Sequence, residues 1–273
     1  MLQTDQGDLM PVVSPLKLIL TALYILVWPA LILFLSGDWH WRQGWIFCGW
    51  FLFVCVSATG WLYRHNPALL AERYRKPGSG GQSRRDQIVV YLLLVGFFAW
   101  IVLQPLDARR FRWTPPLPFA VEVAGGALLA LSWLFLFRSF TDNAFLSPLV
   151  RVQTEREHRV VSDGVYGVVR HPMYLGAILM FLGAPLLVGA ISALLVGVLL
   201  SLLLVARIAD EEKLLATELA GYDEYRRKVR YRLLPLVWSI ALCGTFILTG
   251  GTTRAEPANG LRAVFGELAG VQK

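Results

Sequence analysis

Residues 173–206 read MYLGAILMFLGAPLLVGAISALLVGVLLSLLLVA, an unbroken run of 34 residues without a charged side chain. As one straight helix this run would be about 51 Å long, whereas the hydrocarbon core of a bilayer is about 30 Å thick. The run must therefore fold back on itself, and we expect a helical hairpin with its turn within 187–192. Such a hairpin predicts an all-α fold built inside a membrane.

The composition of the whole chain also indicates a membrane protein. Of its 273 residues 56% are hydrophobic and 16% are charged, against about 45 to 50% and about 25% in an ordinary globular domain. This balance excludes a disordered chain, a collagen and a disulfide scaffold. The cysteines, Cys48, Cys55 and Cys243, lie in apolar runs and are expected to pack there. The net charge of +7 suits nucleic acid or anionic lipid, and the hydrophobicity favours lipid, so no nucleic-acid partner is expected.

Four more apolar runs precede the hairpin. Three are free of charge and about 20 residues long, the length of a membrane-spanning helix, and the fourth carries only Glu122. These runs are 18–37, 43–63, 88–106 and 118–137. Another run, 233–253, follows the hairpin and is either a further span or an interfacial helix. The sequence therefore predicts a polytopic membrane helix bundle of about six to seven transmembrane helices.

Lys and Arg are distributed unevenly between the two ends of these spans. Eighteen of them lie in 64–87, 138–171 and 207–232, whereas four lie in 37–43 and 107–117. Because basic residues near the ends of spans are retained in the cytoplasm, we expect the three richer segments there, with the N-terminus on the same side. The N-terminus lacks the basic region of a signal peptide, so the first span is expected to stay in the mature chain.

The stretch SDGVYGVVRHPMYLG, residues 162–176, leads into the hairpin. Pro172 suits the first turn of a helix, because the N–H that proline lacks would be unpaired there anyway. The first helix of the hairpin is therefore expected to begin at Pro172. Its free backbone N–H groups and partial positive charge would suit a carboxylate or another anion. An ordinary interfacial helix start, with Arg170 and Tyr174 reaching the headgroups, is the alternative.

The stretch RIADEEKLLATELAGYDEYRRKVRYRLLP, residues 207–235, follows the hairpin. Arg207 and Glu211 are spaced i, i+4 and share one helix face. Both stretches therefore meet at the cytoplasmic mouth of one hairpin, where polar groups beside lipid-buried helices are candidates for a functional site. A plain salt bridge between Arg207 and Glu211 is the alternative. By contrast, the Gly- and Ser-rich stretch 77–86 is expected to be a loop without chemistry.

Four elements thus follow one another: HRVVSDGVYGVVRHPMYLG, the apolar hairpin, RIADEEKLL and YDEYRRKVRYRLLP. This order resembles the isoprenylcysteine carboxyl methyltransferase family, integral-membrane enzymes that use S-adenosylmethionine. The similarity covers about 143–238, and LLAERYR (69–75) and LDARRFRW (106–113) look like bacterial members. The resemblance implies N-terminal transmembrane helices in 1–142, a methyltransferase core in 143–238, and an apolar segment with a polar tail in 239–273. No GxGxxG fingerprint follows a strand, so the soluble methyltransferase fold is not expected.

The resemblance implies a role for each matching residue. Arg207 would be the catalytic residue and face the substrate. The cofactor S-adenosylmethionine would be bound by Gln153, His158, Arg159, Val160, Val161, Tyr166, His171, Pro172, Met173, Tyr174 and Glu211. No metal is required.

Three functions remain open on this evidence. Carboxyl O-methylation of an apolar or lipidated, isoprenylcysteine-like acceptor comes first, because an anionic acceptor needs no general base and Arg207 would hold its carboxylate. N-methylation of a phospholipid amine comes second, since a neutral amine would leave Arg207 without an obvious partner. A non-enzymatic membrane protein comes third. In a bacterium the enzyme would lie in the plasma (inner) membrane, with its active site facing the cytoplasm.

Overall fold

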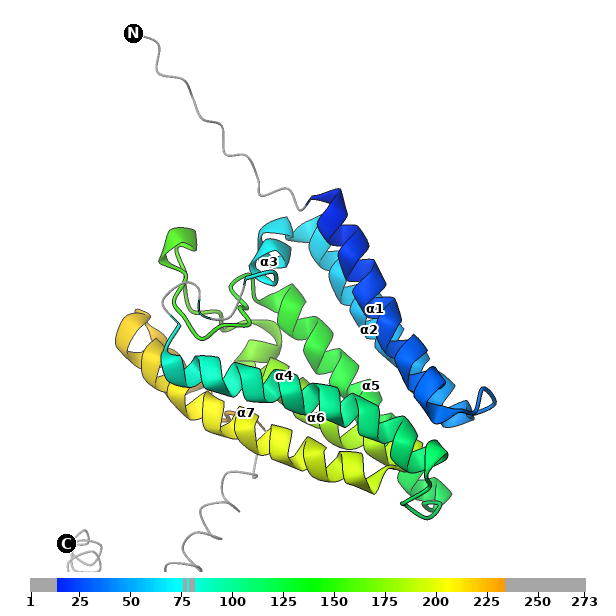
Figure 1. Cartoon of the computed structure of the whole chain (residues 1–273). Helices are drawn as coiled ribbons and strands as arrows, with labels where there is room; N and C mark the ends of the chain where they lie inside the picture. The colour runs from blue at the N-terminus through cyan, green and yellow to red at the C-terminus, as the bar shows by residue number, and fades with distance from the viewer. Residues whose placement is uncertain (1–13, 76–77, 79–81, 234–273) are drawn as a thin grey trace, which may run out of the picture. The chain divides into compact units, whose positions relative to one another are not determined.

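The computed structural model describes residues 14–75, 78 and 82–233 (Figure 1). Within these ranges the chain is helical and has no strand. The elements are α1 (Pro15–Ser36), α2 (Arg42–His65), α3 (Pro67–Glu72), α4 (Arg84–Pro105), η1 (Leu106–Arg110), α5 (Phe119–Asp142), η2 (Thr154–Arg156), η3 (Gly164–Gly167), α6 (Pro172–Val188), α7 (Ile191–Glu218) and α8 (Tyr222–Lys228). The predicted segment 233–253, apart from its first residue, and the predicted tail 239–273 lie outside the described residues.

Five stretches of helix in the described part are long and apolar enough to cross a membrane: α1, α2, α4 continued by η1, α5 and α7. α6 is also apolar but has 17 residues, about 26 Å of helix. Large apolar side chains such as Phe34, Val95 and Leu199 are 72%, 69% and 61% exposed, as expected where lipid covers the surface. The chain is an integral membrane protein, and its described part holds five helices of spanning length and the shorter apolar α6, against the predicted six to seven spans.

α6 and α7 form the predicted hairpin. α6 begins at Pro172, as expected, and ends at Val188. Gly189 follows with φ of 80°, a left-handed conformation that glycine adopts without steric cost. Because α7 then starts at Ile191, the turn lies within the expected 187–192. Figure 1 shows α7 returning alongside α4 and α6.

Asp107, in η1, fastens the turn of this hairpin to the end of α4. Its side chain is fully buried. Its Oδ2 accepts hydrogen bonds from the N–H and the hydroxyl of Ser192, across 2.9 and 2.7 Å. Both oxygens are bonded by Thr114, through its N–H at 2.8 Å and its hydroxyl at 2.9 Å. Since Ser192 lies in the first turn of α7, the carboxylate also stabilises the start of that helix.

α5 and α6 pack backbone against backbone. A Cβ added to Gly125 would lie 2.4 Å from the amide nitrogen of Leu187 and 2.7 Å from the carbonyl oxygen of Gly183. Nearer the start of α6, the hydroxyl of Ser132 donates to the carbonyl oxygen of Gly176 across 2.7 Å. Close approach of small residues is typical of helix contacts in membranes. The contact fixes the start of α6 beside the segment that follows α5.

Candidate active site

A cavity lies at the end of the bundle where α6 begins. The empty space within it is about 800 Å³, which includes open solvent at its mouth. The segments 143–151 and 158–161, the start of α6, the last turns of α7, and α8 form its wall. Elements from both sides of the hairpin therefore enclose one space.

Ten of the twelve predicted site residues line this cavity. They are His158, Arg159, Val160, Val161, Tyr166, His171, Pro172, Met173, Tyr174 and Glu211. The two motifs that flank the hairpin in sequence thus meet in space, as expected from the return of α7 to the level where α6 begins. The contacts of these residues with a cofactor stay predictions.

Tyr174 and Glu211 are joined inside the cavity. The hydroxyl of Tyr174 donates to Oε2 of Glu211 across 2.6 Å. The ring of His171 stacks on that of Tyr174, with centroids 5.6 Å apart and planes 16° from parallel. Oε1 of Glu211 makes no hydrogen bond to any residue that the structure describes. This carboxylate is therefore oriented on one side and available to a ligand on the other.

Glu212, the neighbour of Glu211, has a different role. Its side chain is 3% exposed, and Oε1 lies 2.7 Å from Nε of Arg170 and 3.2 Å from Nε2 of His171. Its Oε2 lies 2.6 Å from Nε of Arg232. The backbone N–H groups of Arg170 and His171 also donate to the carbonyls of Tyr231 and Arg232. Glu212 therefore holds the segment after α8 against the start of α6. The pair of glutamates in the sequence does not by itself separate these two roles.

Three buried tyrosines close the side of the cavity next to α8. The hydroxyl of Tyr225 donates to the carbonyl of Tyr166 across 2.7 Å. The buried hydroxyl of Tyr222 has no hydrogen-bond partner among the described residues. Burial raises the pKa of Tyr166, Tyr222 and Tyr225, and Glu212 and Glu211 raise that of Tyr222 further. All three phenols therefore stay protonated, and the unpaired hydroxyl of Tyr222 is suited to a polar ligand group.

Gln153 is one of the two predicted site residues that do not line the cavity. Its side chain is fully buried. Its Nε2 donates to the carbonyl of Phe145, and its Oε1 accepts from Nη1 of Arg156 across 2.7 Å. The amide thus holds together the loop that forms the cavity wall. Its contact with the cofactor stays a prediction.

Arg207, the other exception, lies behind the cavity wall and pairs with Asp86. Its Nε donates to Oδ1 of Asp86 across 2.7 Å, and Nη2 lies 3.3 Å from Oδ2. Nη2 also donates to the carbonyl of Pro148 across 2.7 Å. Both charged side chains are buried. The alternative of a plain Arg207–Glu211 salt bridge is therefore wrong, because within the described chain Asp86 takes the guanidinium that Glu211 would need.

Asp86 lies at the end of the 77–86 stretch, and the expectation that this whole stretch is a loop is wrong, because α4 already begins at Arg84. That the stretch carries no chemistry stays a prediction. The residue is in the first turn of α4, where its N–H donates to Oγ of Ser83, the N-cap. Its Oδ2 also accepts from Nε2 of Gln82 and from the N–H of Val150. The spacing of Ser83 and Asp86 is a helix-start signal that marks the residue in the sequence. Its pairing with Arg207, 121 positions away, has no local signal.

Comparison with known proteins finds a family whose model matches part of this chain. Residues 126–217, which include all twelve predicted site residues, match the model of the isoprenylcysteine carboxyl methyltransferase family. A protein-S-isoprenylcysteine O-methyltransferase of Schizosaccharomyces pombe is 36% identical over 85 residues, which are 30% of this chain and 36% of that protein. Protein-S-isoprenylcysteine O-methyltransferase B of Arabidopsis thaliana is 26% identical over 149 residues, 54% of this chain and 72% of that protein.

A protein of different chemistry is also similar. A delta(14)-sterol reductase of Mus musculus is 29% identical over 165 residues, which are 54% of this chain and 39% of the reductase. The chain therefore spans less than half the length of both the Schizosaccharomyces pombe and the Mus musculus relatives.

Proposed function

We propose that this chain, whose residues 126–217 match the model of the isoprenylcysteine carboxyl methyltransferase family, transfers a methyl group from S-adenosylmethionine to the carboxylate of a lipidated cysteine. The acceptor is then isoprenylcysteine-like, with an apolar tail in the bilayer and an anionic end. The observation that carries this proposal is the cavity at the mouth of the hairpin, which gathers ten predicted site residues within the segment shared with the family.

The residues around the cavity suit S-adenosylmethionine. When bound, this cofactor supplies an electrophilic methyl group on a positively charged sulfur. Glu211 accepts hydrogen bonds from an amine or hydroxyl of the cofactor, and the unpaired hydroxyl of Tyr222 offers a further partner. The free N–H groups at the start of α6 suit a carboxylate. The aromatic rings of Tyr174 and Tyr225 attract a nearby cation.

The transfer itself needs no general acid or base from the protein. A carboxylate oxygen of the acceptor forms a bond to the methyl carbon while the bond from carbon to sulfur breaks, and no proton moves. The rate then depends on orientation and on the exclusion of water, and well-oriented reactants gain effective molarities of about 10⁵ to 10⁸ M. The stacked His171 and Tyr174 and the rigid start of α6 supply that orientation.

The site is proposed to face the cytoplasm. Its wall comes from 138–171 and 207–232, and basic residues are concentrated in these segments and in 64–87. Such segments are retained on the cytoplasmic side of a membrane. In a bacterial host the membrane is the plasma (inner) membrane.

The test is methyl transfer by the purified protein in detergent. The reaction contains S-adenosylmethionine with a tritiated methyl group and N-acetyl-S-farnesyl-L-cysteine. We expect tritium in a product that releases methanol in base, as a methyl ester does. Replacing the acid by its primary amide serves as the control and should abolish that product. Absence of base-labile tritium with the acid would reject carboxyl methylation of this acceptor class.

N-methylation of a phospholipid amine is the second candidate, and one observation favours it. Arg207 already has Asp86 as its partner, so an amine acceptor no longer leaves the guanidinium unpaired. The same assay with vesicles containing phosphatidylethanolamine separates the two reactions, because an N-methyl product keeps its tritium in base. The family match makes the carboxylate the first candidate.

A further inference from the structure

The acidic residues behind the cavity are already paired. Asp86 holds Arg207, with side chains 6% and 7% exposed. Glu72 lies 3.0 Å from Nη2 of Arg151 and 2.7 Å from Nε of Arg75. Each of these arginines therefore already has a carboxylate partner inside the protein. An anionic acceptor needs a cation that is not paired in this way.

Arg73 is such a cation. It directly follows α3, and its backbone N–H bonds to carbonyls of that helix fix its position. Its side chain is surrounded by the protein but open to solvent, and it makes no hydrogen bond or ion pair with any residue in the described ranges. The guanidinium lies over the ring of Phe140, 5.1 Å from the centroid. Stacking on this ring leaves the N–H groups at the edge of the guanidinium free.

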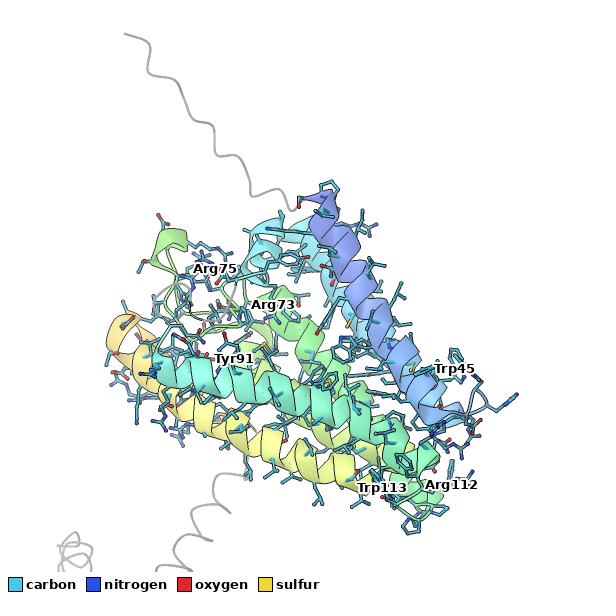
Figure 2. All side chains as sticks on the ribbon, viewed as in Figure 1. Trp45, Arg73, Arg75, Tyr91, Arg112 and Trp113 are labelled. Atoms are coloured by element: carbon cyan, nitrogen blue, oxygen red, sulfur yellow. The ribbon has the colours of Figure 1, made fainter. Side chains whose placement is uncertain are left out.

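Arg73 lies beside the candidate active site, although it is not among the residues that line the cavity. Figure 2 labels it just beyond α3, in the part of the view between α3 and α4. Its pKa is lowered, first because the surrounding protein desolvates the guanidinium and then because of the positive charge of Arg207, while Glu72 opposes this effect. Leu146 lines the cavity and also packs in the apolar cluster that contains Phe140. The surroundings of Arg73 therefore adjoin the cavity wall.

We propose that Arg73 binds the carboxylate of the methyl acceptor, and that Arg207 is held by Asp86 as a neutral structural pair. This inference rests on the proposed function. A guanidinium with a free edge presents two parallel N–H groups to a carboxylate, which fixes its direction as well as its position. Phe140 and Leu146 offer an apolar surface to the lipid tail beside that charge. Arg73 is thus a specificity residue that selects an acid over a neutral analogue.

The experiment compares wild type, Arg73→Gln, Arg73→Lys and Arg85→Gln in detergent. Arg85 is the matched control, because its 75% exposed side chain lies at the same end of the bundle and pairs with Asp210. Three quantities are measured: the KM for N-acetyl-S-farnesyl-L-cysteine, inhibition by its primary amide, and the Kd of S-adenosylmethionine. In Arg73→Gln we expect the KM to rise about tenfold or more, the range of a lost hydrogen bond to a charged group.

Amide inhibition and cofactor Kd should stay at wild-type values in Arg73→Gln, which also reports that the variant is folded. Arg73→Lys should have a KM between those of wild type and Arg73→Gln. Arg85→Gln should match wild type in all three quantities. A wild-type KM in Arg73→Gln, or an equal loss of acid and amide binding, would overturn the role of Arg73. If the wild-type protein does not methylate N-acetyl-S-farnesyl-L-cysteine at all, the proposed function fails. The role of Arg73 fails separately, when wild type is active and Arg73→Gln has the same KM.

Discussion

Arg207 on α7 donates from Nε to Oδ1 of Asp86 on α4 across 2.7 Å, although the two residues are 121 positions apart in the chain. Both side chains are buried, so they form a neutral unit between two packed helices. Removing one partner from such a pair leaves an uncompensated buried charge, which costs about 3 to 5 kcal/mol. The pair therefore fixes the start of α4 against α7, whatever its part in methyl transfer.

Asp86→Asn should lower the free energy of unfolding by about 3 kcal/mol, measured as a fall in the thermal midpoint in detergent. Asp210→Asn is the matched control, because it breaks the ion pair with the exposed Arg85 and should cost at most about 1 kcal/mol. Adding Arg207→Met to Asp86→Asn should restore part of the stability, because the unpaired charge is removed with its partner. Equal midpoints for Asp86→Asn and Asp210→Asn would contradict the structural role of the pair.

The membrane spans and the hairpin were predictable because the thickness of the hydrocarbon core sets the length of a spanning helix. The run 173–206 is too long for one span, and Pro172 and Gly189 mark where its first helix begins and ends. The cavity wall was predictable as well, since both motifs flank the same hairpin. Asp86 and Asp107 were not, because each carboxylate is placed by partners on another helix. Local patterns record the helix start at Ser83 but no contact across the bundle.

Removing the charge of each of the two adjacent glutamates of α7 should affect a different property, cofactor binding for one and stability for the other. Glu211→Gln should weaken the binding of S-adenosylmethionine about tenfold or more, because a charged hydrogen-bond partner is lost, and should change stability little. Glu212→Gln should destabilise the protein by about 3 kcal/mol, because Arg170 and Arg232 lose their buried carboxylate. Calorimetric titration and thermal unfolding separate the two effects. The assignment is wrong if Glu211→Gln binds the cofactor like wild type.

The orientation in the membrane predicts which positions are reached from outside the cell. Thr217, at the end of α7, and His40, between α1 and α2, are both exposed in the protein. Each is replaced by Cys in a chain without the native cysteines. An impermeant thiol reagent added to intact cells should label His40→Cys and spare Thr217→Cys, because the segment 207–232 is rich in basic residues. Labelling of both after the cells are opened is the control, and the reverse pattern in intact cells would invert the topology.

The close contact of α5 with α6 predicts that a single added methyl group destabilises the protein. In Gly125→Ala the new Cβ would meet backbone atoms of Leu187 and Gly183 at 2.4 and 2.7 Å, and backbone cannot move aside as a flexible side chain can. Overpacking of this kind costs about 1 to 3 kcal/mol or more. Gly49→Ala on α2 is the matched control, because nothing lies within 4 Å of its Cβ position. We expect a clear fall in the thermal midpoint for Gly125→Ala and none for Gly49→Ala. A midpoint equal to that of Gly49→Ala would show that the two helices are not in close contact.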